Sequence, residues 1–231
     1  MKVVVTGATK GIGRAVVEKF AQAGADIAFC ARTSSDVEAM LMHLQNLYPK
    51  QKFIAQAVDM ANKEQVLNFG KGIMAQWNEI NVLVNNAGIF IPCKLTDPAN
   101  ADNFVKMMDT NLYSAYYMTQ SLLPSIQQSK KAHIFNLCSI ASFMAYDSYS
   151  VSKFALLGYS KVLREELKKE KVRVTAVMPG AVRTASWDGT DLPDSRFMKV
   201  EDIADAIFAC YNMSEYTVVE ELILRPQLGD I

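Results

Sequence analysis

The sequence predicts a doubly wound α/β fold, with a mainly parallel seven-stranded sheet and helices on both of its faces. Seven short, β-branched apolar runs alternate with longer segments of helical periodicity. Alternation of this kind implies parallel strands joined by right-handed crossovers. The 231 residues lie within the range that one hydrophobic core can fill, and no repeat or Gly/Ser-rich linker divides them. We therefore expect a single domain over residues 1–231.

The elements follow one another in order along the chain. The predicted strands cover residues 3–5, 27–30, 53–58, 82–84, 134–137, 172–177 and 222–224. Helices are expected between them, including 102–121, 149–167 and one that follows Glu201. Residues 185–199 show no clear periodicity, and we expect either an ordinary loop or a mobile lid over a substrate.

Two helices carry start signals. Ser35 and Glu38 form an S-x-x-E pattern that predicts a capping box before an amphipathic helix over 37–47. Asn62 and Gln65 form a weaker signal of the same kind, for a helix that extends to about residue 77.

Composition excludes several classes of protein. The 24 basic residues balance the 24 acidic ones, so no net charge would recruit nucleic acid or an anionic membrane. The first strand begins at Val3, which leaves no room for a secretory signal, and no apolar run approaches the roughly 20 residues of a membrane span. The four cysteines are far apart, and His43 and His133 lie away from every motif. We expect no metal site and a cytoplasmic location.

A glycine-rich turn follows the first strand. Residues 6–13 read TGATKGIG, between an apolar strand and an amphipathic helix. Without Cβ atoms such a turn brings backbone N–H groups close to a pyrophosphate, and the helix N-terminus favours the negative charge. The spacing is TGxxxGxG rather than the general GxGxxG, so the context of strand, turn and helix carries the interpretation.

Further motifs follow in a fixed order. They are NNAG at 85–88, Asn111 on the next helix, Ser139 after the fifth strand, YxxxK at 149–153, Pro179-Gly180 after the sixth strand, and Thr184. The ordered set, which spans almost the whole chain, resembles the short-chain dehydrogenase/reductase family. The resemblance implies a Rossmann-type domain that binds a nicotinamide dinucleotide. By resemblance the cofactor residues are Gly7, Thr9, Lys10, Gly11, Ile12, Gly13, Arg32, Thr33, Asp59, Met60, Asn86, Ala87, Gly88, Tyr149, Lys153, Pro179, Gly180, Val182 and Thr184.

Charge at the end of the second strand favours NADPH over NADH. A free ribose 2′-hydroxyl is normally met by a carboxylate, and a 2′-phosphate by cations. Ala31 occupies the position of that acid, Arg32 follows it, and Lys10 adds a second cation from the glycine turn. The alternative is that both cations are solvated surface charges.

Tyr149 and Lys153 form the predicted proton donor. They are four residues apart on a predicted helix, so their side chains share one face. Bringing a phenol from a pKa of about 10 to about 7 takes about 4 kcal/mol, which a cation about 4 Å away supplies at an effective dielectric constant of about 20. One lysine is therefore expected to suffice.

The family resemblance assigns the remaining roles. Tyr149 is the general acid in reduction, Lys153 also binds the nicotinamide ribose, Ser139 polarises the carbonyl, and Asn111 organises a water relay. Many relatives place the serine 13 residues before the tyrosine, where this chain has Asn136, whereas Ser139 is 10 residues before it. We choose Ser139 because it ends a strand, with Ser142 as the alternative.

The sequence thus predicts an NADPH-dependent reductase of a ketone, aldehyde or 3-oxoacyl group. The competing hypothesis is an NADP(H)-binding sensor of the same fold with little turnover. By resemblance, the helices at 102–121 and 149–167 pair with their copies in a homodimer or homotetramer. The side chains that favour this pairing are Leu112, Tyr113, Tyr116, Tyr117 and Phe154.

Overall fold

A computed structural model describes residues 1–231, and its core is one seven-stranded sheet. The strand order is β3-β2-β1-β4-β5-β6-β7, and every neighbouring pair is parallel, which confirms the predicted fold class. The strands are β1 (Lys2–Thr6), β2 (Asp26–Ala31), β3 (Phe53–Ala57), β4 (Val82–Asn85), β5 (His133–Leu137), β6 (Arg173–Pro179) and β7 (Glu221–Leu224).

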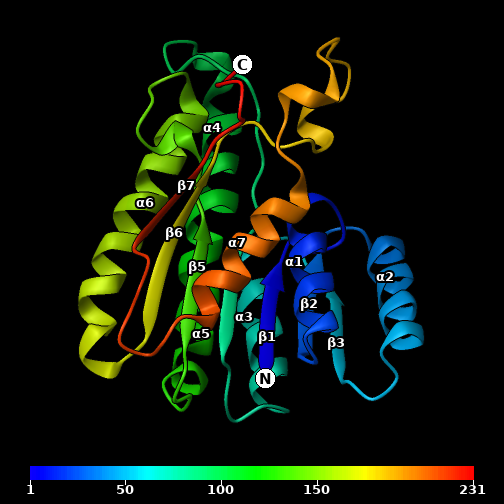
Figure 1. The fold of residues 1–231 in the computed structure, drawn as a ribbon. Coiled ribbons are helices and arrows are strands. Elements are labelled where there is room, and N and C mark those ends of the chain that lie inside the picture. The colour runs from blue at the N-terminus through cyan, green and yellow to red at the C-terminus, as the bar shows by residue number, and fades with distance from the viewer.

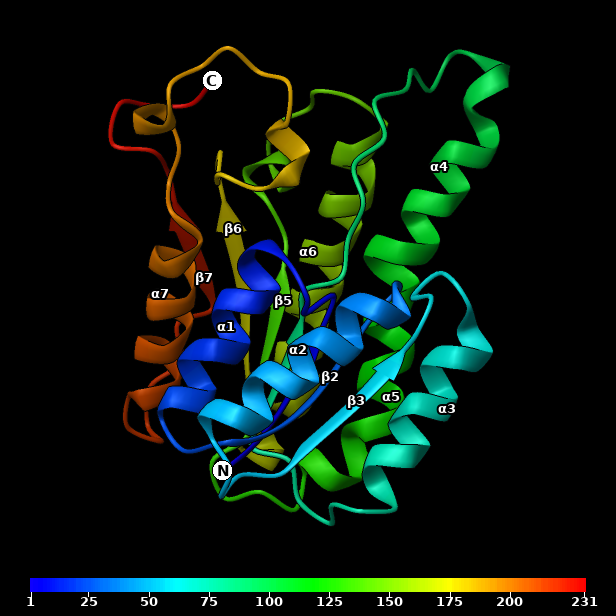
Figure 2. The ribbon, with the colours of Figure 1, turned by 90° about the vertical axis from the view of Figure 1, so that its right-hand side faces the viewer.

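Helices cover both faces of the sheet (Figures 1 and 2). They are α1 (Gly11–Gln22), α2 (Ser34–Leu47), α3 (Lys63–Met74), α4 (Ala101–Met108), α5 (Ser114–Ile126), α6 (Ser148–Leu167) and α7 (Val200–Asn212). One core cluster joins the sheet to α1, α2 and α7, and a second joins it to α3, α5 and α6. The alternation of side chains along β1 divides them between the two cores, because Val3 and Val5 enter the first and Val4 the second. No helix combines the length and the apolar character needed to cross a membrane.

The strand order reverses at β1, which pairs with β2 on one side and β4 on the other. In sheets of this kind the crevice beyond the carboxyl ends of the strands, at the point of reversal, is the usual binding site. These ends lie at the top of Figure 1, together with the segment 185–199 and the chain that follows β7. The fold therefore brings residues from both halves of the chain to one edge of the sheet.

The two predicted helix starts have different outcomes. The capping box at Ser35 is wrong, because the extended residue before α2 is Thr33 and the helix begins at Ser34. The Ser34 hydroxyl donates to the carboxylate of Glu38, one helical turn later, over 2.9 Å. At the second start the prediction is confirmed, since the Asn62 side chain accepts from the Gln65 backbone N–H over 3.1 Å, although α3 ends at Met74.

The predicted helix 102–121 is divided in three. Between α4 and α5 the chain makes a wider π-helical turn over Asp109–Tyr113, which leaves Asn111 almost fully buried. The segment 185–199 is a loop with two short 3₁₀ turns, Ala185–Trp187 and Asp194–Arg196. A parallel bridge between Val182 and Met198 closes its base.

Candidate active site

A cavity of about 570 Å³ lies beyond the carboxyl ends of the strands. Its walls come from the glycine turn, the segment after β4, the ends of β5 and β6, and the start of α6. The predicted site residues that line it are Gly7, Lys10, Gly11, Ile12, Asn86, Ala87, Gly88, Ser139, Tyr149, Lys153, Pro179, Gly180, Val182 and Thr184. The structure therefore gathers in one place residues that are up to 177 positions apart in the sequence, from Gly7 to Thr184.

Other predicted residues lie outside this lining. Thr9, Arg32, Thr33, Asp59, Met60, Gly13 and Asn111 are not part of the cavity wall. The Asp59 carboxylate accepts from the Ala61 backbone N–H over 3.0 Å, so it stabilises its own turn. Met60 is buried with its sulfur 3.7 Å from that of Cys30, and so belongs to the core beneath the site.

The glycine turn is held in a conformation that suits glycine alone at several positions. Gly7 and Gly11 have φ angles of +64° and +54°, in the left-handed region. A Cβ on Gly13 would lie 2.3 Å from the Gly7 carbonyl oxygen and 2.4 Å from the Asn86 side-chain nitrogen. The Asn86 amide donates to the carbonyl oxygens of Thr6 and Gly7, over 2.9 and 2.8 Å, which fixes the turn to the end of β4.

The start of α1 opens onto the cavity without a side-chain cap. Lys10, the residue before the helix, has an extended backbone and makes no capping hydrogen bond. The first N–H groups of the helix are therefore not capped by any side chain, and such groups readily bind a phosphate. Together with the missing Cβ atoms, this geometry fits the pyrophosphate of a dinucleotide.

The charges beyond β2 lie where the sequence places them. Ala31 ends the strand, and Arg32 is exposed and makes no ion pair or side-chain hydrogen bond. Lys10 forms an ion pair of 2.8 Å with Asp36, in the first turn of α2. This contact brings the ammonium of the glycine turn to the beginning of the helix that follows Arg32.

Tyr149 and Lys153 lie on the first turns of α6. Asp147 caps the helix by accepting from the backbone N–H groups of Tyr149 and Ser150, over 2.9 and 3.4 Å. The Lys153 ammonium is 5.6 Å from the centroid of the Tyr149 ring and donates to the Leu137 carbonyl oxygen over 2.7 Å. The predicted pair thus shares one face of the helix, with the lysine bonded to the end of β5.

The protonation of this pair differs from the sequence expectation. Burial raises the pKa of Tyr149 above its ordinary value, although the ring still touches the cavity, and a hydrogen bond with Ser139 opposes the rise only in part. Burial lowers the pKa of Lys153 to about 8. In the protein without a bound cofactor, burial therefore has the largest influence on the Tyr149 pKa, and Lys153 does not produce the lowering that the sequence predicts.

Ser139, rather than Ser142, faces the cavity. Ser139 lies just after β5, contributes to the lining, and accepts from the Ala141 backbone N–H over 3.2 Å. Ser142 is completely buried, and its hydroxyl accepts from the Ser139 backbone N–H over 3.3 Å. Asn136, 13 positions before the tyrosine, points into the core, where its amide donates to the Ser160 hydroxyl over 2.9 Å.

Asn111 acts behind the cavity wall. Its side chain accepts from the Ile89 backbone N–H over 2.7 Å and donates to the Ile89 carbonyl oxygen over 3.0 Å. It also donates to the Ser152 hydroxyl over 2.9 Å. Asn111 therefore ties the segment after β4 to α6, next to Lys153.

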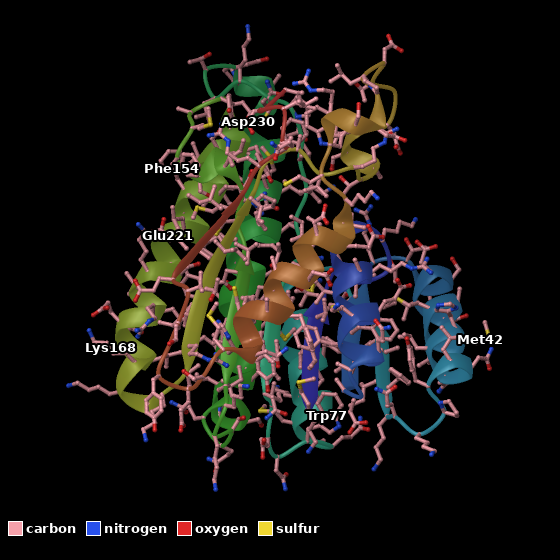
Figure 3. All side chains as sticks on the ribbon, viewed as in Figure 1. Met42, Trp77, Phe154, Lys168, Glu221 and Asp230 are labelled. Atoms are coloured by element: carbon pink, nitrogen blue, oxygen red, sulfur yellow. The ribbon has the colours of Figure 1, made fainter.

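Sequence reasoning missed the aromatic rim and the end of the chain. Phe90 packs edge-on against the Tyr149 ring, with 5.1 Å between centroids, and Tyr146 and Trp187 also line the cavity. Asp230, which lies near the top of the molecule in Figure 3, and Ile231 complete the lining. The rim residues lie in loops without periodic pattern, and only the fold brings Asp230 against Gly180, where a Cβ would lie 3.0 Å from its carboxylate.

Comparisons with known proteins agree with this geometry. A family model for short chain dehydrogenase matches residues 1–192. Sepiapterin reductase from Chlorobaculum tepidum is 34% identical over 239 aligned positions, which cover 99% of this chain and 97% of that protein. The solved structure of L-sorbose reductase from Gluconobacter frateurii with NADPH and L-sorbose has a TM-score of 0.88 at 25% identity, covering 97% of this chain and 95% of that one.

A blue fluorescent protein from a metagenomic library, solved in complex with NADPH, has a TM-score of 0.87 at 27% identity and covers 97% of this chain and 96% of its own. The matched family region includes the glycine turn, the segment after β4, Ser139, and the Tyr149 and Lys153 pair. The chain therefore belongs to the short-chain dehydrogenase/reductase family of oxidoreductases.

Proposed function

We propose that this protein is an NADPH-dependent reductase that converts a carbonyl group to an alcohol, with Tyr149 as the proton donor. The observation that carries the proposal is the single cavity in which Ser139, Tyr149 and Lys153 lie opposite the glycine turn. A cofactor bound along that turn would present its nicotinamide to these side chains.

NADPH is the proposed cofactor, and it would supply the hydride. The uncapped start of α1 suits the pyrophosphate, and Arg32 and Lys10 suit a 2′-phosphate because no acid stands at Ala31. The two solved relatives described above hold NADPH. On this basis the cations, rather than the fold alone, would set the preference for the phosphorylated cofactor.

The side chains then divide the chemistry. Ser139, which lies beside Tyr149 in the cavity wall and lowers the pKa of its phenol, would hold the substrate carbonyl oxygen beside that phenol. Tyr149 would donate its proton to that oxygen as the hydride reaches the carbon. Lys153, with a pKa of about 8, would bind the cofactor ribose and return a proton to the phenol. Asn111, which accepts from the Ile89 backbone N–H, would organise the water relay that resupplies this proton.

The cavity rim favours a carbonyl attached to a flat or apolar group. Phe90, Tyr146 and Trp187 offer ring faces and edges around the mouth, and Ile89 and Ile140 add apolar surface. Aromatic walls stack well on conjugated rings. Sepiapterin, the substrate in the name of the Chlorobaculum tepidum relative, is therefore the first compound to test, followed by simple ketones, aldehydes and 3-oxoacyl thioesters.

The test compares Tyr149→Phe with the matched variant Tyr146→Phe, which removes the hydroxyl of a second tyrosine in the same cavity wall. We expect Tyr149→Phe to lower kcat for NADPH oxidation by about 10²-fold to 10⁴-fold, as loss of a general acid does, with NADPH affinity within twofold. Tyr146→Phe should change kcat by less than about fivefold. Full activity of Tyr149→Phe would refute the proposed proton donor.

The competing sensor hypothesis makes a different prediction in the same assays. A sensor would bind NADPH in a fluorescence titration but oxidise it with no member of the carbonyl panel. The complete set of Asn111, Ser139, Tyr149 and Lys153 around one cavity favours turnover.

We also propose that two copies associate through α5 and α6. Tyr113, Tyr116 and Phe154 are 43%, 41% and 45% exposed, an unusual amount for aromatic side chains on neighbouring helices. Phe154 points outward from α6 at the edge of the molecule in Figure 3. Pairing these helices with their copies would bury this surface in a homodimer, or in one interface of a homotetramer.

A further inference from the structure

The Lys10 ammonium already has an anionic partner. Its ion pair with Asp36 measures 2.8 Å, and the two side chains are 72% and 32% exposed. Asp36 is the acidic residue in the first turn of α2, a helix whose start carries no side-chain cap. The cation that the proposed function assigns to a 2′-phosphate is therefore neutralised by a carboxylate in the free protein.

The neighbouring charged groups do not share this role. Arg32 makes no ion pair, so it meets an incoming phosphate without losing a partner. Glu38, one turn further along α2 than Ser34, accepts a hydrogen bond from the Ser34 hydroxyl over 2.9 Å and makes no ion pair with Lys10. Asp36 alone among the nearby acids competes for a cation of the proposed phosphate site.

We propose that Asp36 is the resting partner of Lys10, and that the 2′-phosphate of NADP(H) displaces it from the ammonium. Asp36 is then a specificity-determining residue, because it weakens the binding of NADP(H) without affecting NAD(H). The inference rests on the proposed placement of the 2′-phosphate between Lys10 and Arg32.

The geometry limits the size of the effect. When the phosphate replaces the carboxylate on the ammonium, the ion pair is lost, and the carboxylate begins its displacement about 6 Å from the phosphate, about twice the 2.8 Å of the observed pair. At that separation in a water-like medium, the repulsion between one carboxylate charge and a phosphate of about two charges, partly screened by salt, corresponds to about threefold to tenfold in affinity. The exposure of both side chains places the effect within this range rather than above it.

The experiment measures binding to the full-length protein and its Asp36→Asn variant. The ligands are NADPH, NADH and the matched pair adenosine 2′,5′-bisphosphate and adenosine 5′-monophosphate, titrated by calorimetry or fluorescence at low and at physiological salt. Glu38→Gln is the control, because it removes one negative charge from the same end of α2 without freeing Lys10. A Lys10→Met background tests whether the effect passes through the ammonium.

We expect Asp36→Asn to bind NADPH and the bisphosphate about threefold to tenfold more tightly, most clearly at low salt. NADH and the monophosphate should stay within twofold, Glu38→Gln should stay within twofold for every ligand, and the gain should shrink in the Lys10→Met background. Unchanged or weaker NADPH binding by Asp36→Asn would overturn the inference, and so would an equal gain for NADH.

The two proposals fail in different ways. If the unmodified protein binds the bisphosphate no more tightly than the monophosphate, the placement of the 2′-phosphate is wrong and the inference is wrong with it. If the unmodified protein discriminates between them but Asp36→Asn binds both as before, only the role of Asp36 is refuted.

Discussion

Gly13→Ala should destabilise the protein and its cofactor site together. The new Cβ would lie 2.3 Å from the Gly7 carbonyl oxygen and 2.4 Å from the Asn86 side-chain nitrogen, so both groups must move. Moving Asn86 weakens its two hydrogen bonds to Thr6 and Gly7, at about 1 kcal/mol each. Overpacking adds about 1–3 kcal/mol, so we expect the free energy of unfolding to fall by about 3–5 kcal/mol.

Urea unfolding followed by circular dichroism measures this loss, and an NADPH titration of the folded variant should show affinity reduced at least tenfold. Gly72→Ala is the matched control, because Gly72 lies in α3 with no atom within 4 Å of the added Cβ. That variant should be more stable by about 0.5–1 kcal/mol, since alanine is favoured within helices. A Gly13→Ala variant that unfolds within about 1 kcal/mol of the unmodified protein would refute the steric reasoning.

Two further predictions concern stability and assembly. Burial first, then Arg173 and Lys131, hold the pKa of His133 well below 6.5, so the folded protein keeps it neutral while the unfolded chain takes up a proton as pH falls below about 6.5. Its contribution to stability is therefore present above that pH and is lost below it. Between pH 7 and 5, urea unfolding should show a loss about 2 kcal/mol smaller in His133→Gln than in the unmodified protein, whereas equal losses would contradict the assignment. Separately, Tyr116→Asp should shift the protein from dimer to monomer in size-exclusion chromatography with light scattering, while Met42→Asp, on the exposed side of α2 (Figure 3), should not. A monomeric unmodified protein, or equal effects of both substitutions, would contradict pairing through α5 and α6.

The parts of the fold that the sequence predicts are those with a local physical cause. Seven β-branched runs separated by helical segments leave parallel strands with right-handed crossovers as the favoured arrangement, and all seven strands lie where expected within a few residues. The helix start at Asn62 also has a local cause, because the N-cap side chain and the backbone N–H that donates to it are three residues apart. The Ser35 capping box fails because the residue before the helix is Thr33, two positions before the predicted cap, so Ser35 already lies inside α2.

The parts of the site that the sequence does not predict depend on packing between distant segments. Phe90, Trp187 and Asp230 line the cavity because the segment after β4, the loop 185–199 and the end of the chain meet there. No periodicity or spacing marks these residues. The motif residues, in contrast, lie at strand ends and helix starts, and their positions follow once the strand order is known.

The protonation of Tyr149 and Lys153 is the clearest case of an environment that spacing cannot supply. Four positions on a helix place the two side chains on one face, but the sequence does not show how much water the surrounding segments exclude. In the structure the exclusion of water by burial is the largest influence on Tyr149, so its pKa is raised and the phenol keeps its proton at neutral pH. A donor in reduction must begin protonated, whereas alcohol oxidation would need the phenolate. The protonated phenol suits the role of proton donor that we propose for Tyr149, and Lys153, with its pKa of about 8, remains mostly charged and would return a proton to the phenol in that proposal.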